Sequence, residues 1–228
     1  MARTRRRTPG GLVYHALNRA ARKAALFTAD DEYDDFLRVL AEAKQQIPMR
    51  ILAYIVMPNH WHLLLWPFGD ADLSRFMHWL TTTHSCRWNL ARERCGEGAV
   101  YQSRFKSIPI QDDTHLLRVW RYVERNALRA NLVPRAEEWR WSSLPYRGRV
   151  GPIEIDEGPI RLPKDWNDIV NQPQTEAELG AIRAATAREI PYGADEWKRL
   201  AGLPVSSGRR GRPRRALPPD ESRDLPFP

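Results

Sequence analysis

Apolar and polar positions along the chain follow two periods, and each period predicts one kind of secondary structure. Short apolar or alternating runs are typical of strands, whereas apolar residues that recur every three or four positions predict helices with one buried face. Strands are predicted over residues 11–18, 49–57, 60–66 and 100–110, and helices over 31–46, 73–94 and 114–130. The Pro58-Asn59 pair between two of the apolar runs predicts a hairpin turn.

The order of these elements predicts an α+β fold. Strand, helix, strand, strand, helix, strand is the ferredoxin-like order, in which an antiparallel sheet carries helices on one face, and here a further helix follows. After Tyr146 the pattern changes to an irregular segment over 148–163 and two short helical patterns over 175–188 and 194–200. From Ser206 the chain has few apolar residues and much Pro and Arg, so this tail is expected to be disordered when unbound.

These changes in pattern divide the chain into four parts. We expect a basic N-terminal arm over 1–10, a main domain over 11–147, a C-terminal helical extension over 148–205 and an Arg/Pro-rich tail over 206–228. The length is enough for one core of ordinary size with an appendage, but not for two large domains.

The chain carries an excess of positive charge. Its 36 Lys and Arg against 28 Asp and Glu give a net charge of +8 and a pI near 9.9. Most of the cations are arginines, whose planar guanidinium suits phosphate. The balance favours a polyanionic partner, most commonly nucleic acid, although a basic surface can also serve solubility alone.

Two further features bear on the compartment. No run of about 18 apolar residues is present, so we expect no membrane-spanning helix and no membrane partner. The two cysteines, Cys86 and Cys95, have neither CxxC spacing nor the pattern of a disulfide framework. A reduced, cytoplasmic setting is therefore expected.

His60 and His62 form an HxH pair inside MPNHWHLLLW. Because side chains alternate along a strand, both imidazoles project from one face while Trp61 projects from the other. Two neutral imidazoles side by side can bind one metal ion. The same spacing also occurs in hydrogen-bonded, inert pairs, so the motif alone leaves both interpretations open. The other histidines, His15, His78, His84 and His115, are expected to pack in the core or to face solvent.

Tyr122 and Asn126 lie four residues apart in RYVERNALRANLV, on one stripe of the predicted helix over 114–130. Arg118 and Arg129 extend the same stripe, so the tyrosine is placed to meet a phosphate. A tyrosine at the margin of the core would show the same pattern.

Together the two motifs indicate a specific chemistry. Tyrosine phenols are weak nucleophiles at neutral pH unless assisted. A divalent metal held by His60, His62 and the Asn126 amide oxygen would polarise a phosphodiester next to the Tyr122 phenol. Mg²⁺ prefers oxygen ligands, so a site with two imidazoles should also accept Mn²⁺ well.

The segments MPNHWHLLL, YQSRFKS and RYVERNALRANLV, in this order and spacing, resemble the REP-associated tyrosine transposases of the HUH single-tyrosine transposase group. The resemblance covers roughly residues 11–146, so the part over 11–147 would be the catalytic domain. It implies that His60 and His62 bind the metal, that Asn126 supplies a further ligand, and that Tyr122 forms a 5′-phosphotyrosine link and leaves a free 3′-hydroxyl. The implied substrates are single-stranded hairpins of repetitive extragenic palindromes, acted on by a monomer in the cytoplasm, at the nucleoid.

The sequence departs from the family pattern at two places. The residue after Asn126 is Ala127, where the family commonly has Pro. An Arg-Gly-Asn turn common after the first strand is replaced here by 18–21, Asn-Arg-Ala-Ala. Neither change touches a candidate ligand or the nucleophile, so the local DNA contacts are what they affect.

Further DNA contacts are expected from basic residues. Arg104 and Lys106 alternate on the predicted strand over 100–110 and would share one face, where they could hold the backbone or line a solvated edge. The tail resembles the arginine-rich tails of the family, and its extended Gly-Arg-Pro core suits the minor groove of a hairpin stem. The tail residues concerned are Arg209, Arg210, Arg212 and Arg214.

Three functions remain open from the sequence. The first is an active DNA-cleaving and strand-transferring enzyme. The second is a regulatory protein that binds hairpin DNA on the same fold without cutting it, for which intact His60, His62 and Tyr122 would be unnecessary. The third is a metal-dependent hydrolase that uses water and leaves no protein attached to DNA.

Overall fold

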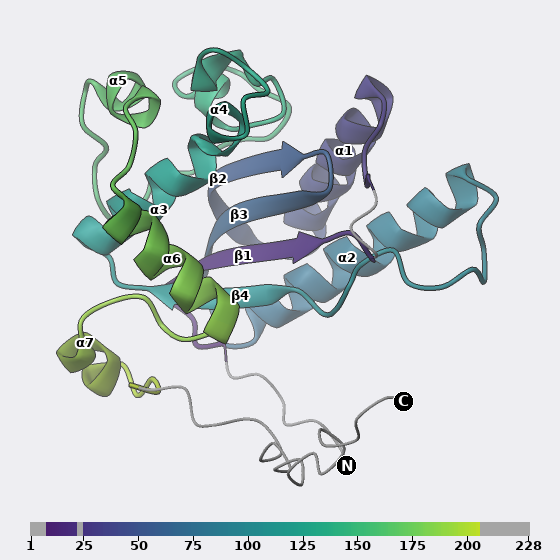
Figure 1. The fold of residues 1–228 in the computed structure, drawn as a ribbon. Coiled ribbons are helices and arrows are strands. Elements are labelled where there is room, and N and C mark those ends of the chain that lie inside the picture. Colours follow the sequence, from purple (N-terminus) through teal and green to yellow (C-terminus); the bar gives the residue numbers. More distant parts are fainter. Residues whose placement is uncertain (1–7, 22–24, 206–228) are drawn as a thin grey trace, which may run out of the picture.

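The computed structural model describes residues 8–21 and 25–205 of the chain. Its centre is a four-stranded antiparallel sheet in the order β2-β3-β1-β4 (Figure 1). The strands are β1 (Val13–Arg19), β2 (Met49–Met57), β3 (His60–Pro67) and β4 (Lys106–Ile110). The β2–β3 hairpin turns at residues 58–59 as predicted, and the predicted α+β fold is confirmed.

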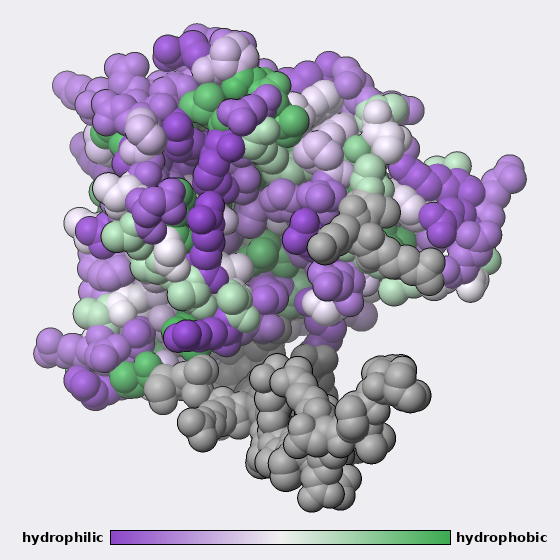
Figure 2. Space-filling model, in the orientation of Figure 1, coloured by the Kyte–Doolittle hydropathy of each residue, from purple (hydrophilic) through white to green (hydrophobic). Residues whose placement is uncertain are grey.

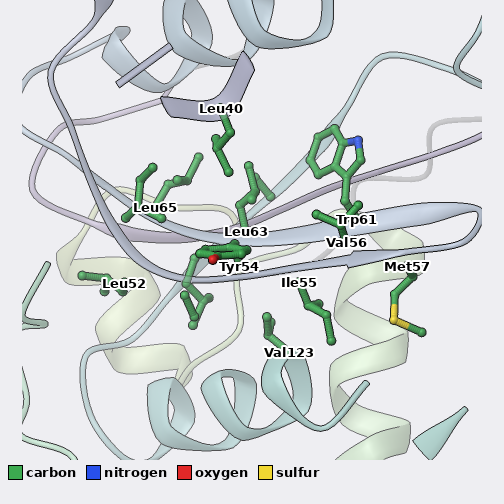
Figure 3. Close-up of a cluster of buried hydrophobic side chains, with 14 of the residues drawn as sticks. Leu40, Leu52, Tyr54, Ile55, Val56, Met57, Trp61, Leu63, Leu65 and Val123 are labelled. Atoms are coloured by element: carbon green, nitrogen blue, oxygen red, sulfur yellow. The ribbon is translucent and has the colours of Figure 1, made fainter. Parts of the chain in front are cut away.

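Helices cover both faces of the sheet. The helices α1 (Asp30–Gln46) and α2 (Asp72–Ala91) lie on the face to which Trp61 points, where the Trp61 ring packs 5.7 Å from Phe36 of α1. The helix α3 (Thr114–Glu124) lies on the opposite face. Figure 3 shows Leu40 of α1 and Val123 of α3 on opposite sides of the strands. Residues of β3 therefore alternate between a face covered by α1 and α2 and a face covered by α3.

The predicted strand over 100–110 is wrong in its first half, since β4 begins at Lys106. Tyr101 makes only an isolated bridge to Ala20, and the Tyr101 phenol turns into the core. There it accepts a hydrogen bond from Trp61 Nε1 at 3.1 Å. Residues 102–104 bend to allow this burial, so the chain joins the sheet only after the bend.

The predicted helix over 114–130 is interrupted at Arg125. The helix α3 ends at Glu124 and α4 (Asn126–Arg129) follows it. The Arg125 nitrogen still donates to the Arg121 oxygen at 2.9 Å, so the path of the chain stays close to helical. The Tyr122 carbonyl, however, accepts from the Arg129 guanidinium at 3.3 Å.

Residues after 130 wrap around the sheet and cover both of its edges. The regular elements are two 3-10 helices, η2 (Ala136–Glu138) and η3 (Leu144–Tyr146), and the helices α5 (Trp166–Asn171), α6 (Glu176–Arg188) and α7 (Asp195–Leu200). The Asp156 nitrogen donates to Ile51 of β2 at 2.9 Å, and the Tyr192 nitrogen donates to Pro109 of β4 at 2.9 Å. Since α6 also packs against α3 and β4, the extension shares one core with the sheet (Figure 1).

The face of the molecule drawn in Figure 2 is mostly hydrophilic. Figure 2 shows hydrophilic residues over most of the visible face, with small apolar groups scattered among them. Within the described residues, no helix combines the length and the apolar character needed to span a membrane.

Candidate active site

The two histidines of the HxH motif lie on the α3 face of the sheet. The His60 and His62 ring centroids are 5.0 Å apart, and the rings are nearly perpendicular, at 89°. Their position follows from the alternation of β3, because Trp61 between them is wholly buried on the other face. His60 lies opposite Arg19 at the end of β1, next to the turn of the β2–β3 hairpin.

Both imidazoles use the same ring nitrogen for a hydrogen bond to the protein. His60 Nδ1 lies 2.6 Å from Asn59 Oδ1, and His62 Nδ1 lies 2.8 Å from His15 Nε2. The second nitrogen, Nε2, is the one that remains for a ligand on each ring. This arrangement is the one in which neutral histidines bind a metal while their other nitrogen is held by the protein.

Burial keeps both rings neutral at physiological pH. Burial, together with smaller effects of the charges of Arg19 and Arg129, lowers the pKa of His60 to about 4. Burial also holds the pKa of His62 well below its usual range, with smaller effects from His15, His60 and Arg129. A neutral imidazole keeps a lone pair for a metal ion, so the two rings need not release a proton to bind one.

His15 is the residue of this site that the sequence did not reveal. It was expected to pack in the core or face solvent, and it is indeed buried, with its pKa lowered to about 3 by that burial. Its ring also stacks on His62 at 4.9 Å and meets the Tyr122 ring edge-on at 6.0 Å. The alternation within β1 places His15 on the same face as Leu17, but only the register with β3 brings it to His62.

Tyr122 reaches the histidines from α3. Its ring centroid lies 5.9 Å from that of His62, with the planes at 86°. The Arg129 guanidinium lies 4.2 Å from the centre of the Tyr122 ring and donates to the Tyr122 carbonyl. The phenol is therefore held between an arginine and two imidazoles on a half-exposed part of the α3 face.

Asn126 lies one turn beyond Tyr122, at the start of α4, and is almost wholly buried. Its amide nitrogen Nδ2 has no hydrogen-bond partner in the described part of the chain. Because the oxygen and nitrogen of an amide are interchangeable by rotation, the same place can hold the oxygen, which is a metal ligand. An unpartnered buried amide is costly, and its cost is relieved when it coordinates a ligand.

The donor set fits a metal held by two imidazoles and one amide. No group of three or more His, Cys, Asp or Glu side chains gathers as a metal centre within residues 8–21 and 25–205. Two histidines whose hydrogen bonds within these residues are to Nδ1, together with the Asn126 amide, are nevertheless suited to a divalent cation that keeps positions open for phosphate oxygens and water.

The residues expected to contact DNA are not in one place. Arg104 is exposed in the bend before β4 and therefore does not share a strand face with Lys106. Lys106 Nζ instead donates to the carbonyls of Thr186 and Ala187 at the end of α6, at 3.1 and 3.3 Å. Arg118 lies 3.5 Å from Glu178 of the same helix. Of these four basic residues, Arg129 is the one that lies at the site, over the Tyr122 ring and close enough to His60 and His62 to affect their pKa values.

The tail residues predicted to bind DNA, Arg209, Arg210, Arg212 and Arg214, lie outside the described residues.

Comparison with known proteins identifies the family. Residues 10–126, just over half of the chain, match the family described as IS200-like transposases. A REP-associated tyrosine transposase of Escherichia coli K12 is 24% identical over 141 residues, which are 59% of this chain and 77% of that protein. A Haemophilus influenzae protein assigned to the same group is 26% identical over 145 residues, 60% of this chain and 81% of its own length.

A solved structure supports the same fold. It is that of a REP-associated tyrosine transposase bound to a REP hairpin, and it is 23% identical to this chain with a TM-score of 0.52. The match covers 69% of this chain and 93% of the other. The chain therefore belongs to the IS200-like transposase family, among relatives that are REP-associated tyrosine transposases.

Proposed function

We propose that this protein is a metal-dependent enzyme that nicks and rejoins single-stranded DNA at palindromic, REP-like hairpins through a 5′-phosphotyrosine at Tyr122. The observation that carries the proposal is the meeting of Tyr122 from α3 with His62 from β3 on one face of the sheet. Their ring centroids are 5.9 Å apart, and His62 is one of two imidazoles whose hydrogen bonds among the described residues are to Nδ1. A protein that only binds DNA needs no such cluster.

The residues that would hold the metal are His60, His62 and Asn126. When bound there, a divalent cation such as Mg²⁺ or Mn²⁺ would act as a Lewis acid that neutralises charge on the scissile phosphate. The protein would supply two neutral imidazoles and an amide as ligands. Burial of both histidines lowers their pKa values and so keeps the imidazoles neutral.

The proposed step is a transfer of the phosphoryl group to the tyrosine. The Tyr122 phenol oxygen attacks the phosphorus, forming the bond from tyrosine oxygen to phosphorus, and the bond from phosphorus to the 3′-oxygen breaks. The proton lost by the phenol is balanced by the one gained by the 3′-oxygen, which leaves as a hydroxyl. Attack of a 3′-hydroxyl on the phosphotyrosine reverses the step and rejoins the strand.

Arg129 would assist the same step. Its guanidinium stacks on the Tyr122 ring at 4.2 Å, so a positive charge already stands where negative charge develops on the phenol and the phosphate. The hydrogen bond to the Tyr122 carbonyl holds the arginine in this place. Arg129 is thus proposed as the DNA contact nearest to the reaction.

The substrate class rests on charge and on the relatives. The net charge of +8 suits a polyanion, and the solved relative is bound to a REP hairpin. We propose hairpin DNA from the sequence around the gene as the first substrate to test.

The test is a covalent-adduct assay. Hairpin DNA labelled on the 3′ side of the expected cut is incubated with the full chain and Mn²⁺ or Mg²⁺ and run on a denaturing protein gel. The wild type is expected to give a labelled, metal-dependent adduct that disappears in Tyr122→Phe. The matched control is Tyr101→Phe, which removes a buried phenol on the other face and is expected to keep the adduct.

Other outcomes would support the other functions. Cleavage that persists in Tyr122→Phe without an adduct would indicate a hydrolase that uses water. Hairpin binding without cleavage or adduct, with every metal and hairpin tried, would indicate a non-cleaving regulatory protein.

A further inference from the structure

The two histidines of the HxH pair are each held by one residue outside the pair. Asn59 holds His60 from the hairpin turn, and its own carbonyl accepts from the Ala20 nitrogen at 2.9 Å, which fixes the turn to the end of β1. His15 holds His62 from the middle of β1, where sheet pairing on both sides fixes its backbone. Both contacts are to Nδ1.

The position of the proton on each ring decides whether the ring can bind a metal. A neutral imidazole has one N–H and one lone pair. With the Asn59 oxygen facing His60 Nδ1, His60 carries its proton on Nδ1, and its Nε2 keeps the lone pair.

The His15–His62 contact has two arrangements. If His62 Nδ1 donates to His15 Nε2, the lone pair of His62 is on Nε2. If His15 donates instead, His62 carries its proton on Nε2 and cannot bind a metal there. Only the first arrangement is compatible with two histidines that act on one cation.

We infer that His15 and Asn59 are positioning residues, which hold His62 and His60 with the proton on Nδ1 so that both Nε2 lone pairs are presented to a divalent cation. The inference rests on the proposed function in one respect, the cation itself. It assigns His15 and Asn59 a role through the histidines, without contact to the DNA or to the reacting atoms.

The tautomers can be measured without metal. Nitrogen-15 NMR of the metal-free, full-length wild type distinguishes an imidazole protonated on Nδ1 from one protonated on Nε2. His60 and His62 are both expected to be protonated on Nδ1 at pH 7. A His62 ring protonated on Nε2 would overturn the inference for His15, and the same result for His60 would overturn it for Asn59.

Metal affinity gives a second readout. Loss of a hydrogen-bond partner of a metal ligand costs about 10- to 100-fold in affinity. By calorimetry with Mn²⁺ alone, His15→Ala and Asn59→Ala are expected to lose affinity in this range. His15→Gln and Asn59→Asp keep an acceptor oxygen and are expected to restore most of it.

His84 is the matched control for folding. It is another buried histidine, with its pKa lowered to about 3 chiefly by burial, and it lies on the other face of the sheet. His84→Ala should lose stability in unfolding experiments but keep its Mn²⁺ affinity.

The outcomes separate the inference from the proposed function. An Mn²⁺ affinity of His15→Ala equal to that of His84→Ala, in a wild type that binds Mn²⁺, would overturn the role of His15. A wild type that binds no Mn²⁺ would contradict the proposed metal site instead, and the NMR measurement would then decide the inference by itself.

Discussion

Two histidine–tyrosine clusters lie on opposite faces of the same sheet, and only one of them is complete within the protein. On the α1/α2 face, Trp61 Nε1 donates to the Tyr101 phenol at 3.1 Å, and that phenol lies 2.7 Å from His84 Nδ1. All three side chains are buried, so their hydrogen bonds replace those lost from water. We call this set (Trp61, Tyr101 and His84) the closed cluster.

On the α3 face, the open cluster consists of His15, His60, His62 and Tyr122, together with Asn126 one turn beyond the tyrosine. Among the described residues, the Asn126 amide nitrogen is buried without a partner, and the hydrogen bonds of the two HxH rings are to Nδ1. Residue types alone therefore do not distinguish a cluster that supports the fold from one that could bind a ligand. In the open cluster the unpartnered Asn126 amide lies one turn beyond the tyrosine, and we propose this part of the α3 face as the place for a ligand.

The largest expected difference between the clusters is in metal binding and cleavage. His62→Ala removes a proposed ligand, so Mn²⁺ affinity should fall by more than the roughly 100-fold upper cost of losing a ligand's hydrogen-bond partner. Adduct formation should fall below detection. The same substitution at His84 in the closed cluster should leave the adduct intact, and equal losses in both variants would remove the distinction.

A smaller difference is expected for two arginines that stack on aromatic rings. The Arg129 guanidinium lies 4.2 Å from the centre of the Tyr122 ring. The Arg92 guanidinium lies 4.0 Å from the centre of the ring of Trp88, a residue of α2. Arg129→Gln should slow adduct formation by about 100-fold, because it removes a preorganised charge from the reaction.

Single-turnover rates with saturating hairpin would measure this effect. Arg92→Gln is the control, because it loses a similar stacking contact and an ion pair with Glu32 far from the tyrosine. It should leave the rate unchanged. If Arg129→Gln also reacts at the wild-type rate, Arg129 only supports the fold of α4.

The smallest expected effect, about tenfold in the unfolding equilibrium for each pH unit, concerns the pH dependence of stability in the closed cluster. Burial lowers the pKa of His84 to about 3, whereas an unfolded histidine titrates at its ordinary value near 6.5. Between these two pH values, His84 is protonated in the unfolded state and stays neutral in the folded state. The free energy of unfolding should therefore fall by about 1.4 kcal/mol per pH unit from this group as pH drops from about 6.5 towards 3.

His84→Gln lacks the titrating imidazole. The slope of its free energy of unfolding against pH should therefore be smaller than that of the wild type by about 1.4 kcal/mol per pH unit. Urea unfolding of both proteins at several pH values between 7 and 4 would measure the two slopes. Parallel slopes would mean that His84 is protonated in the folded state as readily as in the unfolded chain.

The elements and motifs that depend on local periodicity could be predicted from the sequence. The alternation of β3 put His60 and His62 on one face, and the period of the helix put Tyr122 near Asn126. The first follows from the geometry of one strand, and the second from a backbone that stays close to helical across Arg125, where α3 ends and α4 begins.

What could not be predicted depends on pairing between distant elements. His15 meets His62 only because β1 pairs with β3 in one register, and no local pattern gives that register. The strand pattern predicted that the Lys106 amine could contact DNA. In the structure this amine donates hydrogen bonds to carbonyls at the end of α6, which lies some 80 residues later in the sequence. The strand β4 begins later than predicted because the Tyr101 phenol is buried in the closed cluster. Its hydrogen bonds to Trp61 and His84 are likewise contacts between distant segments.

The most direct test of the open cluster is to identify the residue that becomes linked to DNA. The adduct formed by the wild type, hairpin DNA and Mn²⁺ would be digested with protease and nuclease and sequenced by mass spectrometry. We predict a nucleotide joined through its 5′-phosphate to the phenol of Tyr122, with a 3′-hydroxyl on the other product. A link at Tyr101 or at any other residue, or cleaved DNA with a free 5′-phosphate and no attached peptide, would contradict the account.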